Sequence, residues 1–296
     1  MRIISLLMGT LLATTPAIAL AQGGMTHDMS SHDMTMHSPA NAADDTTLAP
    51  DAEHAAARLD ASPRHGQWIM IPTARGDSLR AWIVYPERST KAPVVIVIHE
   101  IFGMSTWIRA VTDQLAKEGY IAIAPDLING PKIPVGPDSL SNQEAVALVS
   151  KLNPVDVQMD IDAAAKYGMA LPSALHKYGI VGFCWGGTVS FAHAVHSPSL
   201  GASVVYYGTS PSAAELHEVR APVLGLYGGA DARVDATVPA ADSEMKAMHK
   251  IYEPHIFDGA GHGFLRAQGG NNGANLAATQ KAWPATIQWF RKYLGS

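Results

Sequence analysis

The sequence predicts an α/β fold in which helices cover both faces of a doubly wound, mostly parallel sheet. Three observations support this prediction. Segments typical of strands alternate with segments typical of helices from residue 65 to residue 293, as expected for an α/β domain. The run Pro93–His99 consists mainly of Val and Ile, as in a strand buried on both faces of a parallel sheet. No internal repeat or second domain boundary follows residue 63.

The first two expected strands, Gln67–Thr73 and Leu79–Tyr85, form a hairpin because only a short polar stretch separates them. The last strand, Ile251–Phe257, is expected at an edge of the sheet, where Pro254 is tolerated without a backbone donor. The other strands are expected at 93–99, 120–126, 178–181, 202–208 and 222–228. The expected helices cover 106–118, 141–152, 156–167, 185–196, 238–249 and 280–293.

The N-terminus has the features of a secretory signal peptide. Met1 and Arg2 precede a short apolar stretch that ends in Ala19-Leu20-Ala21, a small-x-small cleavage pattern. We expect cleavage after Ala21 and export to the periplasm or the medium. A membrane anchor is the weaker interpretation, because Thr and Pro interrupt the stretch. The expected organisation is a signal peptide at 1–21, a disordered tail and linker at 22–63, and a folded α/β domain at 64–296.

The tail has no apolar periodicity, but it is rich in methionine and histidine. Thioether and imidazole groups suit Cu(I) and, with less preference, other late transition metals. Two interpretations stay open, a solvated low-complexity segment and a copper-binding segment. The candidate ligands are Met25, His27, Met29, His32, Met34, Met36 and His37.

Composition narrows the class of partner. The chain is 47% hydrophobic and 16% charged, which describes a globular protein. Its net charge of −5 and its lack of a Lys/Arg-rich run give no footprint for nucleic acid or an anionic membrane. No segment after the signal peptide is apolar enough to span a bilayer. A small molecule is therefore the expected partner, with no nucleic acid and no membrane after signal cleavage.

The only cysteine, Cys184, stands in Gly182-Phe183-Cys184-Trp185-Gly186-Gly187, between a buried-strand pattern and a helix pattern. Small residues two before and two after it let the backbone turn sharply and expose the central residue beside a backbone N–H group. A buried packing cysteine is the alternative interpretation. A lone cysteine cannot form an intramolecular disulfide, so a catalytic thiol is the preferred hypothesis.

Candidate partners for the thiol follow other expected strands. Glu100 and Asp231 come just after buried strands, and His262 lies in a glycine-rich loop after the last strand. Because function collects at the carboxyl ends of strands in open α/β sheets, we expect these side chains to converge on Cys184. The chain order of nucleophile, acid and histidine is that of the α/β hydrolases. Asp235 is an alternative to Asp231 as the acid.

From about Gly66 to Leu294 the sequence resembles the dienelactone hydrolases, the cysteine branch of the α/β hydrolases. The resemblance implies an α/β-hydrolase fold that cleaves carboxylic esters or lactones and needs no cofactor. It rests on five motifs in order: His99-Glu100-Ile101-Phe102-Gly103, Ala124-Pro125-Asp126-Leu127, Gly182–Gly187, Gly228-Gly229-Ala230-Asp231 and Gly261-His262-Gly263-Phe264.

The chemistry of the residues agrees with this resemblance. Cys184 is the expected nucleophile, His262 its base, and Asp231 the acid that orients the imidazole. The backbone N–H groups of Ile101 and Trp185 are the expected oxyanion donors, and attack would give a thioester acyl-enzyme that water hydrolyses. The resemblance further implies that Glu100 pairs with the resting thiol and takes part in its activation. An ion-pair role in its loop is the alternative.

The substrate is less constrained. Arg266 matches a position where the family holds a substrate carboxylate, and a solvated loop charge is the competing interpretation. Ser141–Val149 lacks the Arg and the Tyr that dienelactone-specific members carry there, which argues against dienelactone itself. A serine-type hydrolase is excluded because no Gly-x-Ser-x-Gly elbow is present. The rival hypothesis is an exported copper-binding protein that uses the tail and keeps the hydrolase-like domain as a scaffold.

Overall fold

A computed structural model describes residues 44–128 and 140–295 of the chain. Within these ranges, eight strands form one mixed sheet in the order β1-β2-β4-β3-β5-β6-β7-β8. The β1–β2 and β2–β4 pairs are antiparallel, and every other pair is parallel. The predicted hairpin, the mostly parallel sheet and the edge position of the last strand are therefore confirmed. The strands are β1 Gly66–Pro72, β2 Ser78–Val84, β3 Ala92–Ile98, β4 Ile121–Pro125, β5 Ala174–Phe183, β6 Ala202–Tyr206, β7 Val223–Gly228 and β8 Tyr252–Phe257.

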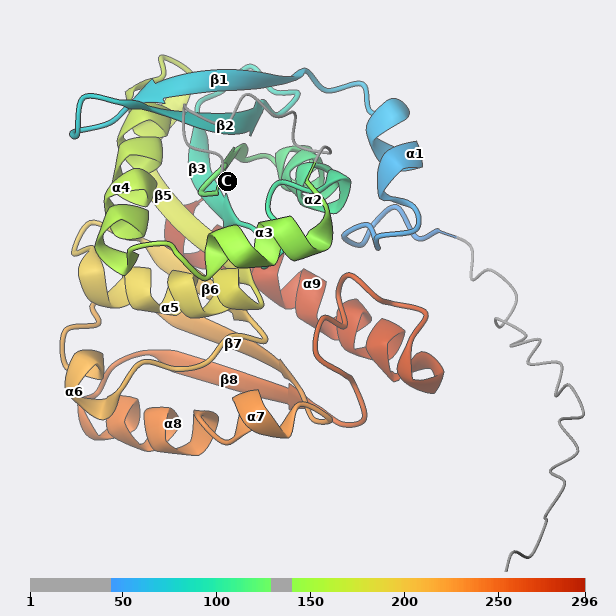
Figure 1. Cartoon of the computed structure of the whole chain (residues 1–296), viewed down its shortest axis with the longest axis vertical. Coiled ribbons are helices and arrows are strands. Elements are labelled where there is room, and N and C mark those ends of the chain that lie inside the picture. The colour runs from blue at the N-terminus through green and yellow to red at the C-terminus, as the bar shows by residue number, and fades with distance from the viewer. Residues whose placement is uncertain (1–43, 129–139, 296) are drawn as a thin grey trace, which may run out of the picture. The chain divides into compact units, whose positions relative to one another are not determined.

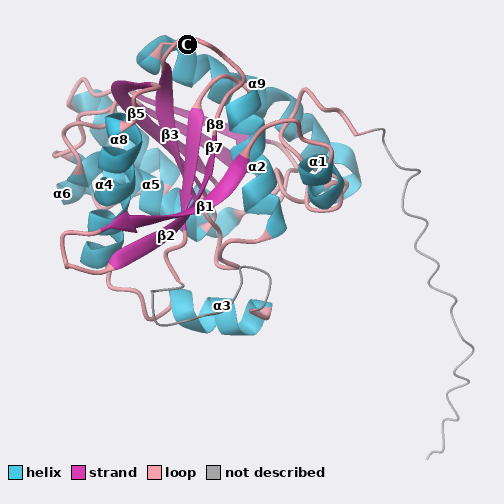
Figure 2. Ribbon diagram, turned by 90° about the horizontal axis from the view of Figure 1, so that it is seen from above, coloured by secondary structure: helices cyan, strands magenta, loops and turns pink. Residues whose placement is uncertain are grey.

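Helices lie on both faces of the sheet (Figure 1, Figure 2). Alternate side chains of β3 divide the core into two layers: Val94 and Ile96 pack with residues of α4 and α5, whereas Val95 and Val97 pack with residues of α2 and α9. The helices are α1 Ala55–Asp60, α2 Thr106–Lys117, α3 Asn142–Val149, α4 Pro154–Ala170, α5 Trp185–His196, α6 Ala213–Leu216, α7 Ala232–Asp235, α8 Val238–Ala247 and α9 Ala274–Leu294, with a 3-10 turn at Asn271–Gly273.

The prediction of a disordered linker is wrong for residues 44–60, which pack against the α/β domain. Leu48, Ala49 and Ala55 are buried in the same layer as α2 and α9, and α1 packs beside α2. The Trp107 indole donates to the Pro50 carbonyl at 2.8 Å. Single residues of this segment contact distant parts of the chain, so the segment has no regular apolar period that would have predicted its packing.

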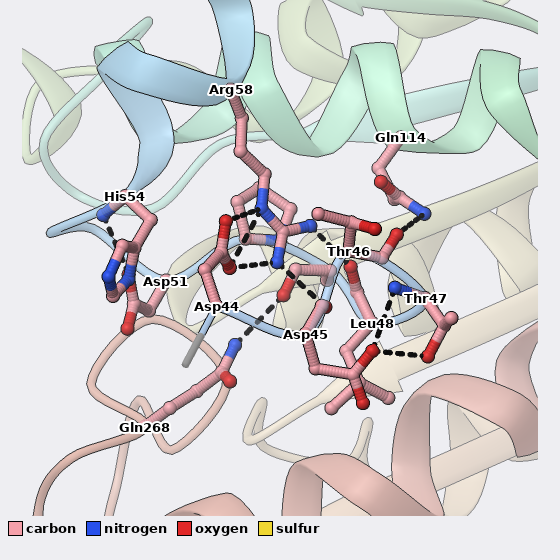
Figure 3. A network of polar contacts seen from close by, with 12 residues as sticks. Asp44, Asp45, Thr46, Thr47, Leu48, Asp51, His54, Arg58, Gln114 and Gln268 are labelled. Atoms are coloured by element: carbon pink, nitrogen blue, oxygen red, sulfur yellow. Dashed lines mark hydrogen bonds and ion pairs between the residues drawn. The ribbon is translucent and has the colours of Figure 1, made fainter. Parts of the chain in front are cut away.

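Polar contacts hold the same segment in place (Figure 3). Arg58 forms an ion pair with Asp44 and donates to the Leu48 carbonyl at 2.7 Å. The Gln268 amide donates to the Ala49 carbonyl at 2.9 Å, and the Ala52 N–H group donates to the Arg266 carbonyl at 2.9 Å. The N-terminal segment (residues 44–60) therefore supports the loop that carries Arg266.

Three short helices, α1, α6 and α7, were not expected from the sequence, and α9 begins six residues before its predicted start at residue 280. The short helices contain too few residues to show a period of 3.6. None of the helices in the described ranges is both long and apolar enough to cross a bilayer. The predicted signal peptide and the Met/His-rich tail lie outside the described residues.

Candidate active site

The backbone turns sharply at Cys184, between β5 and α5, in a conformation that L-residues rarely adopt (φ 58°, ψ −118°). The turn depends on two glycines. A Cβ on Gly182 would lie 1.8 Å from the Gly186 carbonyl oxygen, and a Cβ on Gly186 would lie 2.5 Å from the carbonyl oxygens of Ile98 and His99. Strained non-glycine backbone of this kind costs about 1–3 kcal/mol and concentrates at functional sites. The fold thus contains the elbow that the sequence predicts.

The sulfur of Cys184 has opposing electrostatic neighbours. Burial raises the pKa of its thiol, and the Glu100 carboxylate raises it further. The backbone N–H groups of Trp185 and Ile101, together with the Arg233 guanidinium, act in the opposite direction. The resting thiol is therefore protonated at neutral pH, and two N–H groups already face the atom that would carry negative charge.

His262 and Asp231 are in direct contact. The Nδ1 atom of the imidazole lies 2.5 Å from Oδ2 of Asp231, and the side chains are 35% and 9% exposed. A carboxylate only accepts hydrogen bonds, so it selects the Nδ1–H tautomer and leaves the lone pair on Nε2. Asp231 also begins α7, where its Oδ1 accepts from the Val234 N–H group at 3.4 Å. Both carboxylate oxygens are thereby oriented.

The alternative acid, Asp235, does not make this contact. Its Oδ1 is buried without a hydrogen-bond partner among the described residues. Burial first, and then the charge of Asp231, raise the pKa of Asp235. Of the two candidates, the structure brings Asp231 to the imidazole.

The loop that carries His262 is fastened from the start of α9. The Gly261 N–H group donates to Asn275 Oδ1 at 2.9 Å, and Asn275 Nδ2 donates to the Ala267 carbonyl at 2.7 Å. Asn275 is buried. Sequence reasoning missed it, because an asparagine in a loop-like stretch has no spacing signal that links it to a histidine 13 residues earlier.

Glu100 and Arg266 form an ion pair at the same end of the sheet. Arg266 Nε lies 2.9 Å from Glu100 Oε2, and the arginine also lies over the Phe102 ring at 5.1 Å. Glu100 is 4% exposed and Arg266 36% exposed. Burial raises the pKa of Glu100 to about 7, although the positive charge of Arg266 opposes this rise. The carboxylate is thus close to Cys184 and paired with the arginine.

Tyr207 is a second residue that sequence reasoning missed. It directly follows β6, has a positive φ of 39° and is fully buried. Its ring lies 5.1 Å from the His262 ring, centroid to centroid, and its hydroxyl has no hydrogen-bond partner within the described ranges. Burial, followed by the charges of Glu100 and Cys184, raises the pKa of the phenol. Its position at the carboxyl end of β6 was the only available signal.

Helix α3 brings apolar side chains close to this site. Ala145 and Val149 form a small cluster with Ile128, and Ile101 and Trp185 pack against it. The helix begins with a capping box in which Ser141 and Glu144 satisfy each other's backbone N–H groups. The stretch that lacks the family's Arg and Tyr therefore contributes buried apolar side chains that pack against the two residues whose N–H groups face the sulfur.

Residues 44–128 and 140–295 contain no group of three or more His, Cys, Asp or Glu arranged to hold a metal ion. The candidate copper ligands of the tail lie outside these ranges, so metal binding by the tail stays a prediction.

Known proteins are similar to this chain in sequence and in fold. The model of the dienelactone hydrolase family matches residues 79–294. A provisionally named carboxymethylenebutenolidase of Salmonella typhimurium is 34% identical over 241 residues, which are 76% of this chain and 86% of that one. A protein of Saccharolobus solfataricus with the same provisional name is 30% identical over 249 residues, covering 73% of this chain and 95% of its own.

Among solved structures, the crystal structure of a provisionally named dienelactone hydrolase from Klebsiella pneumoniae has a TM-score of 0.68 at 29% identity, covering 78% of this chain and 99% of that one. The family match covers most of the α/β domain, including the elbow and the Asp231–His262 pair. The chain therefore belongs to the dienelactone hydrolase family.

Proposed function

We propose that the protein hydrolyses carboxylic esters or lactones through Cys184, His262 and Asp231. The observation that carries this proposal is the pairing of a strained cysteine elbow with a histidine whose tautomer is selected by Asp231. In the proposed first step, Nε2 of His262 takes the thiol proton as sulfur attacks the carbonyl carbon. The N–H groups of Ile101 and Trp185 stabilise the negative oxygen of the tetrahedral intermediate.

Collapse of this intermediate expels the alcohol portion, which takes the proton from the imidazolium, and leaves a thioester on Cys184. Water then attacks the thioester with His262 as base, releasing the acid and restoring the thiol. The raised pKa of the thiol means that activation accompanies substrate binding instead of preceding it. The Glu100 carboxylate, whose pKa is near 7, is the second proposed acceptor for the thiol proton.

The proposed substrate carries an apolar portion and, beside it, a carboxylate. Support for the carboxylate comes from Arg266, which is partly exposed and whose present partner is Glu100. Support for the apolar portion comes from the partly exposed side chains of Ile101 and Trp185, which pack against α3. The relatives named for carboxymethylenebutenolidase are consistent with a lactone or an ester.

We further propose export of the mature chain, on the basis of the charged, apolar and small-x-small pattern of residues 1–21. Fractionation of cells that express the full chain tests this proposal. The mature protein should be recovered outside the cytoplasm with its N-terminus near Gln22, and an uncleaved protein in the cytoplasm would contradict it.

An ester and lactone panel tests the proposed chemistry. Cys184→Ala should abolish hydrolysis, and Asp231→Asn should reduce kcat by about 10⁴-fold, as found when a triad aspartate can no longer hold the histidine tautomer. Asp235→Asn is the matched control, because this neighbouring, partly buried aspartate is not the carboxylate that pairs with His262; it should leave kcat close to that of the wild type. Full activity in the Cys184→Ala protein would refute the thiol mechanism.

A further inference from the structure

His99 is a fully buried histidine next to the candidate oxyanion donor, and the proposed reaction gives it no role. Its Nδ1 atom lies 2.7 Å from the Glu100 carbonyl oxygen. A carbonyl only accepts, so Nδ1 carries the proton and donates it. Nε2 is then an unprotonated acceptor, and it has no hydrogen-bond partner within the described ranges. The ring stacks on Trp185, with centroids 5.4 Å apart and an interplanar angle of 24°.

The hydrogen bond acts on one particular peptide group. The Glu100 carbonyl and the Ile101 N–H group belong to the same peptide, which is trans, so the two groups point in opposite directions. Any partner that fixes the direction of the carbonyl also fixes the direction of the N–H group. A hydrogen bond accepted by the carbonyl additionally polarises the N–H bond and strengthens it as a donor.

A second donor holds the same carbonyl. The Gly103 N–H group donates to the Glu100 oxygen at 3.2 Å, and Gly103 itself has a positive φ of 69°, which favours glycine. A Cβ at Gly103 would lie 2.4 Å from Ile128 Cδ1, so a larger residue would also have to displace this side chain. One backbone donor and one side-chain donor therefore clamp the peptide from its carbonyl side.

We infer that His99 is a positioning residue, which uses its Nδ1–H group to aim the Ile101 N–H group at the oxyanion of the tetrahedral intermediate. The inference rests on the proposed function, because the oxyanion forms only if Cys184 attacks a carbonyl. It adds one requirement to the proposed function: the reaction rate depends on the Nδ1–H group of His99, although this group does not touch the substrate. The His99 ring also stacks on Trp185, whose backbone N–H group is the other oxyanion donor. The same imidazole therefore contacts one donor residue and the peptide group that carries the other donor.

Two substitutions separate this role from a merely structural one. Asn places an amide donor near the position of Nδ1 but removes the stack, whereas Leu fills space and removes every polar atom, including the unpartnered Nε2. If His99 only packs, His99→Leu should be the more stable and the more active variant. If it positions the peptide, His99→Leu should lose roughly ten- to a hundredfold in kcat with little change in KM. His99→Asn should then recover much of that loss in kcat, even if the Asn variant is less stable than the Leu variant.

Alkylation of Cys184 by iodoacetamide supplies a reaction that needs the thiolate but forms no oxyanion. Its rate on the high-pH plateau should be the same in the wild type, His99→Leu and His99→Asn. His193→Leu is the matched control, because His193 is equally buried but bonds Gln158 and Tyr178 at 2.7 and 3.0 Å, away from the elbow. It should lower the unfolding temperature without a specific loss in kcat.

The inference is overturned if His99→Leu keeps the wild-type kcat, if His99→Asn is no better than His99→Leu, or if alkylation falls in parallel with hydrolysis. The activity of Cys184→Ala distinguishes a failure of the proposed function from a failure of the inference about His99. A fully active Cys184→Ala protein would remove the proposed function, whereas an inactive one beside a fully active His99→Leu protein would remove only the role of His99.

Discussion

The Arg266 guanidinium lies 2.9 Å from the carboxylate of Glu100, and it holds a buried negative charge close to the sulfur of Cys184. The pair links the part of the site that would bind a substrate carboxylate to the part that would perform chemistry. A substrate anion that competes for Arg266 would leave Glu100 without its partner. Four predictions follow from this pair and from the segment that supports the Arg266 loop.

Replacing Glu100 with Gln should make the thiol more reactive toward alkylation. Burial raises the pKa of Cys184 most, and the Glu100 charge adds to the rise, so removing that charge lowers the pKa. The rate of iodoacetamide alkylation at pH 7 should increase roughly tenfold for each unit by which the pKa falls. The profile of rate against pH measures the shift, and an unchanged or rightward-shifted profile would contradict the assignment.

The stability of the protein should decline as pH rises between about 4.5 and about 7 because of Glu100. In this window the unfolded chain has released the proton, whereas the native carboxyl, with its pKa raised mainly by burial, retains it. The native state therefore binds more protons, and the free energy of unfolding falls with increasing pH. The decline amounts to about 3 kcal/mol from a shift of this size. Urea unfolding of the wild type and Glu100→Gln should show that the variant lacks this contribution.

Arg266→Gln should discriminate between substrates by their charge. For an ester that carries a free carboxylate, loss of a charge-assisted hydrogen bond should lower kcat/KM by about 1.5–3 kcal/mol, or ten- to a hundredfold. A neutral ester of similar size shows how far kcat/KM falls simply because Glu100 has lost its partner. Dividing the loss on the charged ester by the loss on the neutral ester corrects for this effect. Arg220→Gln, an exposed arginine in the segment before β7, is the control variant. Equal losses on both esters would make Arg266 a structural loop residue.

Removal of residues 22–60 should destabilise the protein, although composition marks this stretch as a linker. The deletion exposes the pocket of Leu48 and removes the bonds to Trp107, Gln268 and Arg266. The free energy of unfolding should fall by at least about 2 kcal/mol, which is the scale of one buried leucine. Deletion of residues 23–38 is the control, and it should change neither stability nor ester hydrolysis. Equal stability of the two shortened chains would contradict the role of the N-terminal segment.

Local patterns sufficed for much of the fold and for the identity of the candidate site. The runs of Val and Ile predicted the buried strands, and Pro254 predicted an edge strand, which β8 is. Glycines at fixed offsets from Cys184 predicted the elbow, because only residues without a Cβ allow the contacts found at Gly182 and Gly186. The order of Cys184, Asp231 and His262 along the chain predicted their convergence, since parallel strands end at one edge of the sheet.

The sequence by itself determined which residues could do chemistry, because residue type and spacing encode the elbow, the strand ends and the family motifs. Only the tertiary structure decided how those residues act on one another. Contacts between distant segments chose Asp231 over Asp235 for His262, paired Arg266 with Glu100 and buried the N-terminal segment. The fold also set the buried His99 ring against the carbonyl of its neighbour Glu100, which shares a peptide group with Ile101. The pKa values of Glu100 and Cys184 depend on how deeply each group is buried and on which charges lie beside it. The fold determines both, and a local sequence pattern does not predict them.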